Sequence, residues 1–221
     1  MEEKFKMWKN FLLPYKFALD ELKTKVNIMV EETKYMEETS LIEHVKTRLK
    51  TPDSIMTKLE RKGMKPTVAN ASENLFDIAG MRIVTPFKSD VYQLYNLMMN
   101  RTDLKIVEVK DYIRFPKSNG YQSLHLIVKV PVTLSKGIEH IFVEVQIRTL
   151  AMDFWASLEH KIYYKYEASI PAYLEKGLKE AADTVKELDD KMKLIHDEVE
   201  GLHTSKVISI HVKEDEGGRK R

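Results

Sequence analysis

The segment HIFVEVQIRT, residues 140–149, alternates apolar and polar side chains along most of its length. The apolar positions are Ile141, Val143, Val145 and Ile147, and the polar positions are Glu144, Gln146 and Arg148. A period of two, with β-branched residues on one phase, predicts a strand that buries one face and keeps the other polar. This strand is the starting point for the fold.

The segments on both sides of the strand extend the pattern. Thr149 can cap a helix, LAMDFWASLEHKIYYKYE, whose predicted buried stripe is Phe154, Trp155, Leu158 and Ile162. Upstream, strands are predicted at 44–50, 74–87, 104–112 and 121–130, helices at 54–62 and 89–101, and a turn at 131–137. This order predicts an α+β domain with a mixed sheet of about five strands.

Two long helices are predicted to flank this centre. Apolar residues recur in steps of four and three from Trp8 to Met36, broken at Thr33, and Pro14 predicts a kink or a helix start near residue 15. The same steps recur from Leu174 to Leu202, as expected for helices that pack within or between chains. We therefore divide the chain into an N-terminal helical segment (1–40), a central domain (41–168), a C-terminal helix for packing or oligomerisation (169–204) and a tail (205–221) expected to be disordered.

The composition sets the broad class of protein. The chain has 221 residues, 43% of them hydrophobic, and no cysteine, which excludes disulfides and thiolate zinc sites and fits a reducing compartment. The N-terminal segment is too charged for a signal peptide, and no run approaches the roughly 18 apolar residues of a membrane span. We therefore expect a cytoplasmic protein without a membrane partner. A net charge of +2 argues against nucleic acid as the main ligand.

The polar faces of the predicted strands combine cations with an aromatic residue. The cations are Arg48, Lys50, Arg82 and Arg148, and the strand after the Asn119-Gly120 turn places Tyr121, Ser123 and His125 on one face. Guanidinium and ammonium groups bind phosphates, and a tyrosine ring or an arginine plane can stack on a base. If these faces converge, they form a cationic cleft suited to nucleotides.

Two acids lie among these cations. Asp77, at the mouth of one strand, and Glu144, within another, are the best pair to hold Mg²⁺, which favours carboxylates together with substrate phosphates. The alternative for each acid is an ion pair with a neighbouring cation. The sequence contains no P-loop, no G-x-G-x-x-G and no H-E-x-x-H, and Glu159 and His160 are predicted to be structural or to support the site from behind.

Four motifs resemble those of a known family. They are FDIAGMRI (76–83), YIRFPKSNGYQSLH (112–125), EVQIRT (144–149) and WASLEHKIYYK (155–165). In this order they resemble the synthetase domain of the RelA/SpoT family, and the short chain with flanking helices is similar to small alarmone synthetases of the RelP or RelQ type. The resemblance implies a nucleotidyltransferase-like α+β fold and transfer of the pyrophosphate of ATP to the 3′-hydroxyl of GDP or GTP, giving ppGpp or pppGpp and AMP. It also implies Mg²⁺ and a homotetramer.

The resemblance also implies roles for residues on the acceptor side. Tyr121 would stack on the guanine of GDP or GTP, and Lys117 and His125 would meet the phosphates of that nucleotide. Asn119 would turn the loop that carries them, and Gln146 would belong to the same binding site.

On the donor side, Glu144 would activate the 3′-hydroxyl and hold Mg²⁺ together with Asp77. Two arginines match those that sandwich adenine, and two lysines match those that grip the ATP phosphates. These residues of the ATP site are Arg48, Arg82, Lys50 and Lys58.

Asp153 departs from the pattern of the family, since related small synthetases have Asn at this position, which is implicated in guanine recognition. A carboxylate could accept hydrogen bonds from guanine, so the resemblance implies a guanine contact here. Two other readings stay open: a protein that binds single-stranded RNA through its basic strand and Tyr121, and a nucleotide sensor without catalysis. The first gives no role to the two acids, and the second predicts that one of them is disabled.

Overall fold

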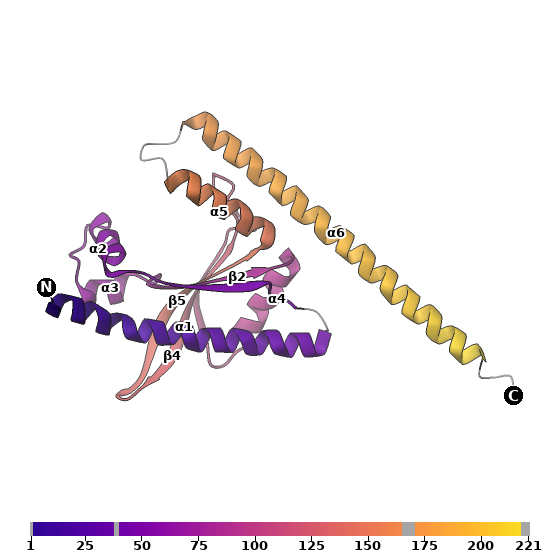
Figure 1. Cartoon of the computed structure of the whole chain (residues 1–221), viewed down its shortest axis with the longest axis horizontal. Helices are drawn as coiled ribbons and strands as arrows, with labels where there is room; N and C mark the ends of the chain where they lie inside the picture. Colours follow the sequence, from indigo (N-terminus) through magenta and orange to yellow (C-terminus); the bar gives the residue numbers. More distant parts are fainter. Residues whose placement is uncertain (1, 38–39, 165–170, 218–221) are drawn as a thin grey trace.

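The computed structural model describes residues 2–37, 40–164 and 171–217, and side chains over 7–35, 40–162 and 171–202. The strands are β1 (His44–Leu49), β2 (Ala79–Thr85), β3 (Lys105–Asp111), β4 (Leu124–Leu134) and β5 (Gly137–Thr149). The helices are α1 (Glu2–Glu37), α2 (Pro52–Arg61), α3 (Val68–Asn74), α4 (Lys88–Met99), α5 (Leu150–Tyr164) and α6 (Ala172–Gly217) (Figure 1). Within these described ranges, no helix combines the length and the apolar character needed to cross a membrane.

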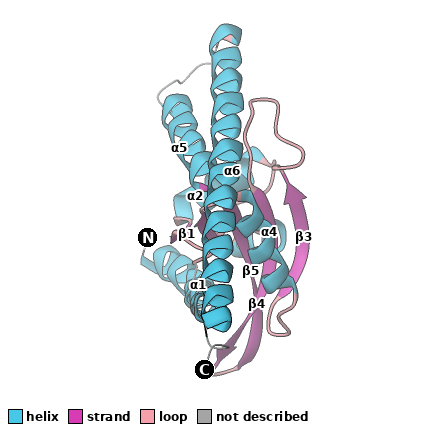
Figure 2. Cartoon of the chain, turned by 90° about the vertical axis from the view of Figure 1, so that its right-hand side faces the viewer, coloured by secondary structure: helices cyan, strands magenta, loops and turns pink. Residues whose placement is uncertain are grey.

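The five strands form one mixed sheet, which confirms the predicted α+β fold. Their order is β1-β2-β5-β4-β3, with β2 parallel to β5 and every other neighbouring pair antiparallel. The strand predicted from residues 140–149 is therefore the centre of the sheet. Figure 1 shows α1 along one side of the sheet and α5 with α6 on the other, and Figure 2 shows α5 and α6 side by side.

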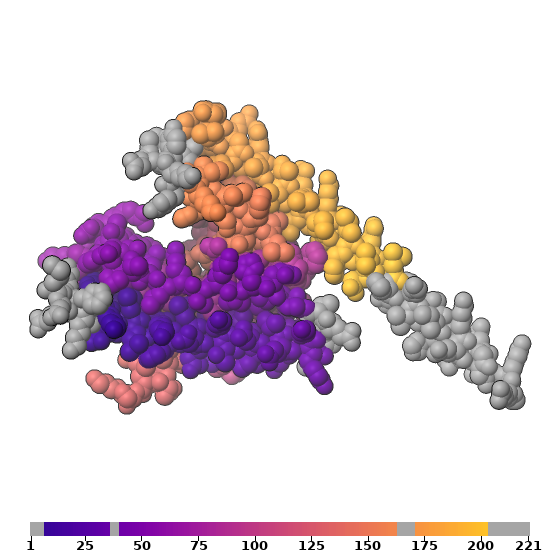
Figure 3. Space-filling view, viewed as in Figure 1, coloured from indigo at the N-terminus to yellow at the C-terminus, as the bar shows by residue number. Residues whose placement is uncertain are grey.

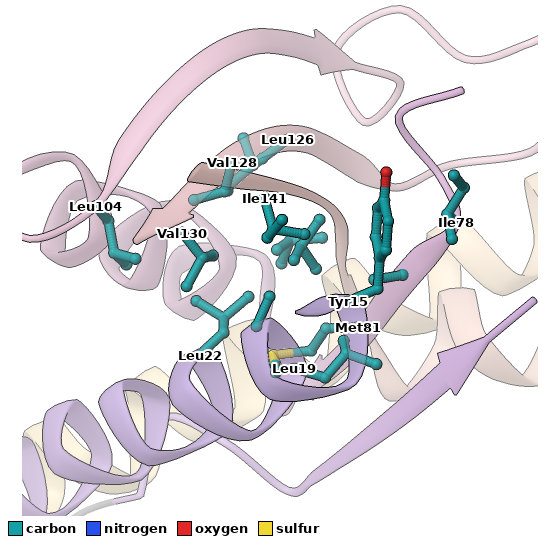
Figure 4. Close-up of a cluster of buried hydrophobic side chains, with 14 of the residues drawn as sticks. Tyr15, Leu19, Leu22, Ile78, Met81, Leu104, Leu126, Val128, Val130 and Ile141 are labelled. Atoms are coloured by element: carbon teal, nitrogen blue, oxygen red, sulfur yellow. The ribbon is translucent and has the colours of Figure 1, made fainter. Parts of the chain in front are cut away.

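Helix α1 belongs to the main hydrophobic core and is not a separate unit. Its apolar seam packs against buried side chains of β2, β4 and β5, including Met81, Val128 and Ile141 (Figure 4). Full burial of a leucine such as Leu22 contributes about 1.5–3 kcal/mol. The helix begins at Glu2, so the predicted alternative of a start after the proline is wrong.

Thr33, the polar residue that interrupts the seam of α1, is also buried. Its hydroxyl donates to the backbone carbonyls of Met29, at 2.9 Å, and Val30, at 3.0 Å. These bonds satisfy the hydroxyl within the helix itself, so a polar residue can be buried among the apolar side chains of the seam.

Capping residues account for the starts of several helices. The Thr51 side chain accepts from the backbone N–H of Ser54 at 3.3 Å, and Pro52 is the first residue of α2. The Thr149 hydroxyl accepts from the backbone N–H of Met152 at 3.2 Å, which confirms the predicted cap of α5. This cap places α5 directly after the central strand.

The structure corrects the predicted turn at 131–137. Strand β4 continues to Leu134 and pairs there with Gly137, so only Ser135 and Lys136 form the turn. Pro131 is tolerated because it lies beyond the end of β3, where β4 has a partner on one side only. The start of β4 is also later than predicted, so Tyr121 lies in a loop and Ser123 is buried, donating to the Ile147 carbonyl at 3.2 Å.

The predicted buried stripe of α5 is wrong except at Trp155. Phe154, Leu158 and Ile162 are exposed, and Met152, Trp155 and Ala156 are buried instead. The reason is that α6 covers α5 from one side only. Trp155 packs with Ala182 of α6 and donates its indole N–H to the Leu178 carbonyl at 3.1 Å.

Helix α6 is longer than predicted. It runs to Gly217, past the predicted boundary at residue 204, and 218–221 lie outside the described residues. The expected disorder of the tail stays a prediction. No proline follows Pro171, so nothing in the sequence interrupts the helix.

Figure 3 shows that α6 crosses the upper side of the molecule. Up to His196, which packs on Phe87, the helix still contacts the body. Between residues 188 and 202, a stripe of apolar side chains on α6 is exposed: Leu188, Met192, Ile195, Val199 and Leu202.

Candidate active site

The register of the sheet brings the polar faces of the strands together, as predicted. Lys46 lies opposite Arg82, which lies opposite Gln146, which in turn faces His125. Polar side chains from β1, β2, β5 and β4 therefore form a row across the sheet.

The next row of the sheet contains a gap. Arg48 pairs with Gly80, and Gly80 pairs with Glu144. Because Gly80 has no side chain, space remains between the arginine and the carboxylate. The two rows enclose a cleft of about 170 Å³, lined by Lys46, Thr47, Arg48, Gly80, Met81, Arg82, Glu144 and Gln146.

Asp77, two residues before β2, lies between the two lysines assigned to ATP phosphates. Its Oδ2 is 3.3 Å from Nζ of Lys50 and accepts a short hydrogen bond from Nζ of Lys58. Burial alone would raise the pKa of Asp77, but the hydrogen bond from Lys58 and the charges of both lysines hold the pKa below its usual value. The carboxylate is therefore ionised at neutral pH.

The acids fit a magnesium ion. The second oxygen of Asp77, Oδ1, is buried and has no hydrogen-bond partner, and Glu144 is a carboxylate that lines the cleft. Within the described residues, no three histidine or acidic side chains form a ready-made metal cluster. This donor set is typical of Mg²⁺, which binds one or two carboxylates and takes its other ligands from water and phosphates.

On the acceptor side, Tyr121 and His125 are in direct contact. Nη2 of Arg148 donates to Tyr121 Oη at 3.0 Å, and Tyr121 Oη lies 2.8 Å from Nε2 of His125. Burial, together with the positive charges of Arg148, Lys117 and Lys110, lowers the pKa of His125 to about 3. His125 is therefore a neutral hydrogen-bonding group at pH 7, not a cation.

Glu144 is held between two of these groups. Its Oε2 accepts from Nε2 of Gln146 at 3.0 Å, and its Oε1 lies 3.8 Å from Nδ1 of His125. When the Tyr121 hydroxyl donates to Nε2 of His125, the imidazole proton is on Nδ1 and faces Glu144. A carboxylate oriented in this way can accept a proton from a hydroxyl group in the cleft.

The loop before β4 carries the other acceptor residues. Nζ of Lys117 lies 4.8 Å from the ring centroid of Tyr112 and 4.9 Å from that of Tyr121. The Asn119 side chain accepts from the backbone N–H of Tyr121 at 3.1 Å and donates to Glu159 of α5 at 3.0 Å. Glu159 thus supports the loop from behind, as predicted.

Gly120 allows α6 to pack on this loop. Its φ of +89° is unfavourable for other residues, and a Cβ at this position would overlap with the Cβ of Ala182 on α6. The acceptor loop and the C-terminal helix are therefore in direct contact.

Gly120→Ala is expected to destabilise the protein more than Gly63→Ala. Both positions have positive φ, which costs about 1–2 kcal/mol for alanine, but Gly63 has open space around it. The additional loss at Gly120 therefore measures the contact with α6. Thermal unfolding followed by circular dichroism checks this, and equal losses for the two variants would contradict it.

The carboxylate of Asp153 is hydrogen-bonded to two arginines. Its Oδ1 accepts from Nη1 of Arg82 at 3.1 Å and from Nη1 of Arg148 at 3.4 Å. Asp153 is thus already paired with two arginines at the position where the resemblance implies a guanine contact.

Sequence reasoning counted Arg148 among the cations of the cleft but assigned it no specific contact, although its phase on β5 matches that of Glu144 and Gln146. The structure places it between Tyr121, Gln146 and Asp153, only 3% exposed, with its guanidinium carbon 5.4 Å from the centroid of the Tyr121 ring. Tyr112 was also missed as a contact of Lys117, and no periodicity could have identified it because the contact forms within an irregular loop.

Comparisons with known proteins identify the family to which the chain belongs. A family model described as a region found in RelA / SpoT proteins matches residues 47–169. The chain is 51% identical to GTP pyrophosphokinase YwaC of Bacillus subtilis over 193 residues, which cover 87% of this chain and 92% of that protein.

Two solved structures extend the comparison to the fold. Small alarmone synthetase 1 from Bacillus subtilis bound to its product pppGpp matches with a TM-score of 0.80 and 39% identity, covering 88% of this chain and 98% of that chain. The same synthetase bound to AMPCPP matches with a TM-score of 0.74 and 35% identity, with the same coverage. The similarity thus includes regions outside the matched family model.

Proposed function

Because the chain belongs to the RelA/SpoT family, we propose that it is a small alarmone synthetase that acts as a GTP pyrophosphokinase. It transfers the pyrophosphate group of ATP to the 3′-hydroxyl of GDP or GTP, and the products are ppGpp or pppGpp and AMP. The observation that carries this proposal is a carboxylate, Glu144, oriented on the floor of a cationic cleft. The reaction belongs to the cytoplasm, as part of the stringent response.

Glu144 accepts the proton of the 3′-hydroxyl as the oxygen attacks the β-phosphorus of ATP. A bond forms between the 3′-oxygen and the β-phosphorus, and the bond from the β-phosphorus to the oxygen bridging it to the α-phosphorus breaks, so AMP leaves. Positioning and charge neutralisation dominate this class of reaction. Arg48 and Arg82 hold the adenosine part of ATP, and Lys50 and Lys58 bind its phosphates.

On the acceptor side, Tyr121 stacks on guanine and Lys117 binds phosphate groups. Lys117 lies 4.9 Å from the Tyr121 ring centroid in this structure, so stacking requires a ring face that the ammonium group leaves free. Asn119 keeps the loop turned, and His125 and Gln146 orient Glu144 and the nucleotide by hydrogen bonds.

Asp77 and Glu144 are the residues that would hold Mg²⁺. A bound magnesium ion supplies positive charge next to the phosphates. In the free protein Lys50 and Lys58 neutralise Asp77, and the phosphates of ATP offer these lysines an alternative partner.

The simplest test supplies ATP labelled at the γ-phosphate, GDP and Mg²⁺ to the purified protein and separates the products by anion exchange. We expect a labelled guanosine tetraphosphate with equimolar AMP, and loss of both products on chelation. Binding of the nucleotides without product from GDP, GTP or GMP would instead indicate a sensor.

We also propose that the protein is a homotetramer assembled through exposed apolar faces of α5 and α6. Four side chains on α5 share a stripe left open to solvent: Leu150, Phe154, Leu158 and Ile162. The stripe on α6 is defined above. Continuous apolar faces of this kind mark interaction sites.

Met192→Glu is therefore expected to lower the particle mass in light scattering, because burying an unpaired charge in an apolar interface is unfavourable. The control is Leu13→Glu on α1, which also replaces a half-exposed apolar side chain but lies outside both stripes. An unchanged mass for Met192→Glu would place the contacts between subunits elsewhere.

A further inference from the structure

Asp153, in the first turn of α5, lies between two arginines from different strands. Its Oδ1 accepts from Arg82 on β2 and from Arg148 on β5, as described above, and its Oδ2 faces Nε2 of His44 at 4.0 Å. The side chain of Asp153 is 13% exposed and that of Arg82 is 37% exposed. One carboxylate therefore connects a cation on the open side of the cleft to a buried one.

Arg148 extends this connection to the acceptor side. Besides Asp153, its guanidinium donates to Tyr121 Oη at 3.0 Å and to Oε1 of Gln146. The planar group has five N–H donors in a fixed geometry, so it can hold all three partners at once, which a lysine cannot do. The chain of contacts thus runs from Arg82 through Asp153 and Arg148 to Tyr121 and Gln146.

The members of this chain depend on one another. Two guanidinium groups close to the same oxygen repel each other, and the negative charge of the carboxylate offsets this repulsion by attracting both. If a buried cation loses its partner, the folded state is strongly destabilised. Fixing Arg82 therefore also fixes Asp153 and, through it, Arg148.

We propose that Asp153 and Arg148 are positioning residues that couple the two nucleotide sites. ATP bound at the partly exposed Arg82 restrains this side chain, and the shared carboxylate passes the restraint to Arg148 and its partners Tyr121 and Gln146 on the side of the guanine nucleotide. When the first ligand has restrained the network, binding of the second ligand loses less conformational entropy. The two binding free energies are coupled by the same amount in both directions. The inference rests on the proposed function, since it requires ATP at Arg82 and a guanine nucleotide at Tyr121.

The test is to measure the Kd of GDP by calorimetry with and without a saturating non-hydrolysable ATP analogue. The Kd of the ATP analogue is then measured with and without saturating GDP. In the wild type the ratio of the two Kd values should lie in the range of about 5–150 that is typical of coupled sites. Asp153→Asn keeps the shape but removes the charge, and Arg148→Lys keeps the charge but removes the fork. Each should bring the ratio to within about twofold of one, and the double variant should lose no more, because both changes break the same chain of contacts.

Asp103→Asn is the matched control. Asp103 also pairs with two cations, Arg101 at 2.7 Å and Lys25 at 2.9 Å, but it lies outside the cleft. It should lower the melting temperature and keep the ratio. If Arg148→Lys does not fold, Asp153→Asn decides the matter alone, with its own melting curve as the check of folding.

Two results would overturn the coupling while leaving the synthetase proposal intact. They are a ratio of one in the wild type and an unchanged ratio in Asp153→Asn. If the unchanged ratio is accompanied by a loss of GDP affinity, Asp153 is assigned to a direct guanine contact. A wild type that binds neither nucleotide would overturn the proposed function, and the coupling with it.

Discussion

Glu144→Gln is expected to lower kcat by about 10²–10⁴-fold, the usual contribution of a general base, and to leave the affinity for GDP nearly unchanged. Glutamine keeps the volume of the side chain and an oxygen that can accept from Gln146, as Glu144 does at 3.0 Å. It cannot accept the proton of the 3′-hydroxyl. Steady-state rates with ATP and GDP, together with the Kd of GDP in the absence of magnesium, separate the two effects.

Glu139→Gln is the control for this variant. Glu139 lies on the same strand, β5, at its exposed outer end, and it is not among the residues that line the cleft. It should leave both the rate and the affinity unchanged. Retained turnover in Glu144→Gln would show that another group accepts the proton.

Asp77→Asn is expected to lower kcat by about 100-fold or more at saturating nucleotides and to raise the Mg²⁺ concentration needed for half-maximal rate. A metal ion beside the phosphates contributes several kcal/mol of charge stabilisation, and an amide is a weaker ligand than a carboxylate. The substitution also releases Lys50 and Lys58 from their counter-charge. Affinity for ATP without Mg²⁺ should therefore be retained or improved.

The alternative for Asp77 is an ion-pair partner with no metal to hold, and the same measurements distinguish it. In that case the melting temperature would fall while kcat at saturating Mg²⁺ stayed within a few-fold of the wild type. Asp103→Asn, a carboxylate paired with two cations away from the cleft, shows how much the loss of such a pair costs in stability alone.

The alternation of residues 140–149 was sufficient to identify the central strand and to assign its two faces. The polar phase of each strand, once identified, also predicted that Arg48, Arg82, Glu144 and Gln146 would share a face, and the register of the sheet confirms this. These properties are local: side-chain direction follows from the strand period, and caps such as Thr149 act within one helical turn.

Helix faces were harder to assign from the sequence. The stripe of Phe154, Leu158 and Ile162 has the right spacing for burial, yet these side chains are exposed because α6 covers only the Trp155 side of α5. Periodicity identifies an apolar face but not what packs against it.

The sequence by itself thus determined the α+β fold, the central strand, the two carboxylates and the family to which the chain belongs. Only the tertiary structure showed that Arg148 is buried beneath Tyr121, that Lys58 pairs with Asp77, and that Asp153 is shared between two arginines. The physical reason is that the charge state and hydrogen bonds of a buried group depend on partners distant in the sequence. Arg82 and Asp153 are 71 positions apart, and no local pattern encodes their contact.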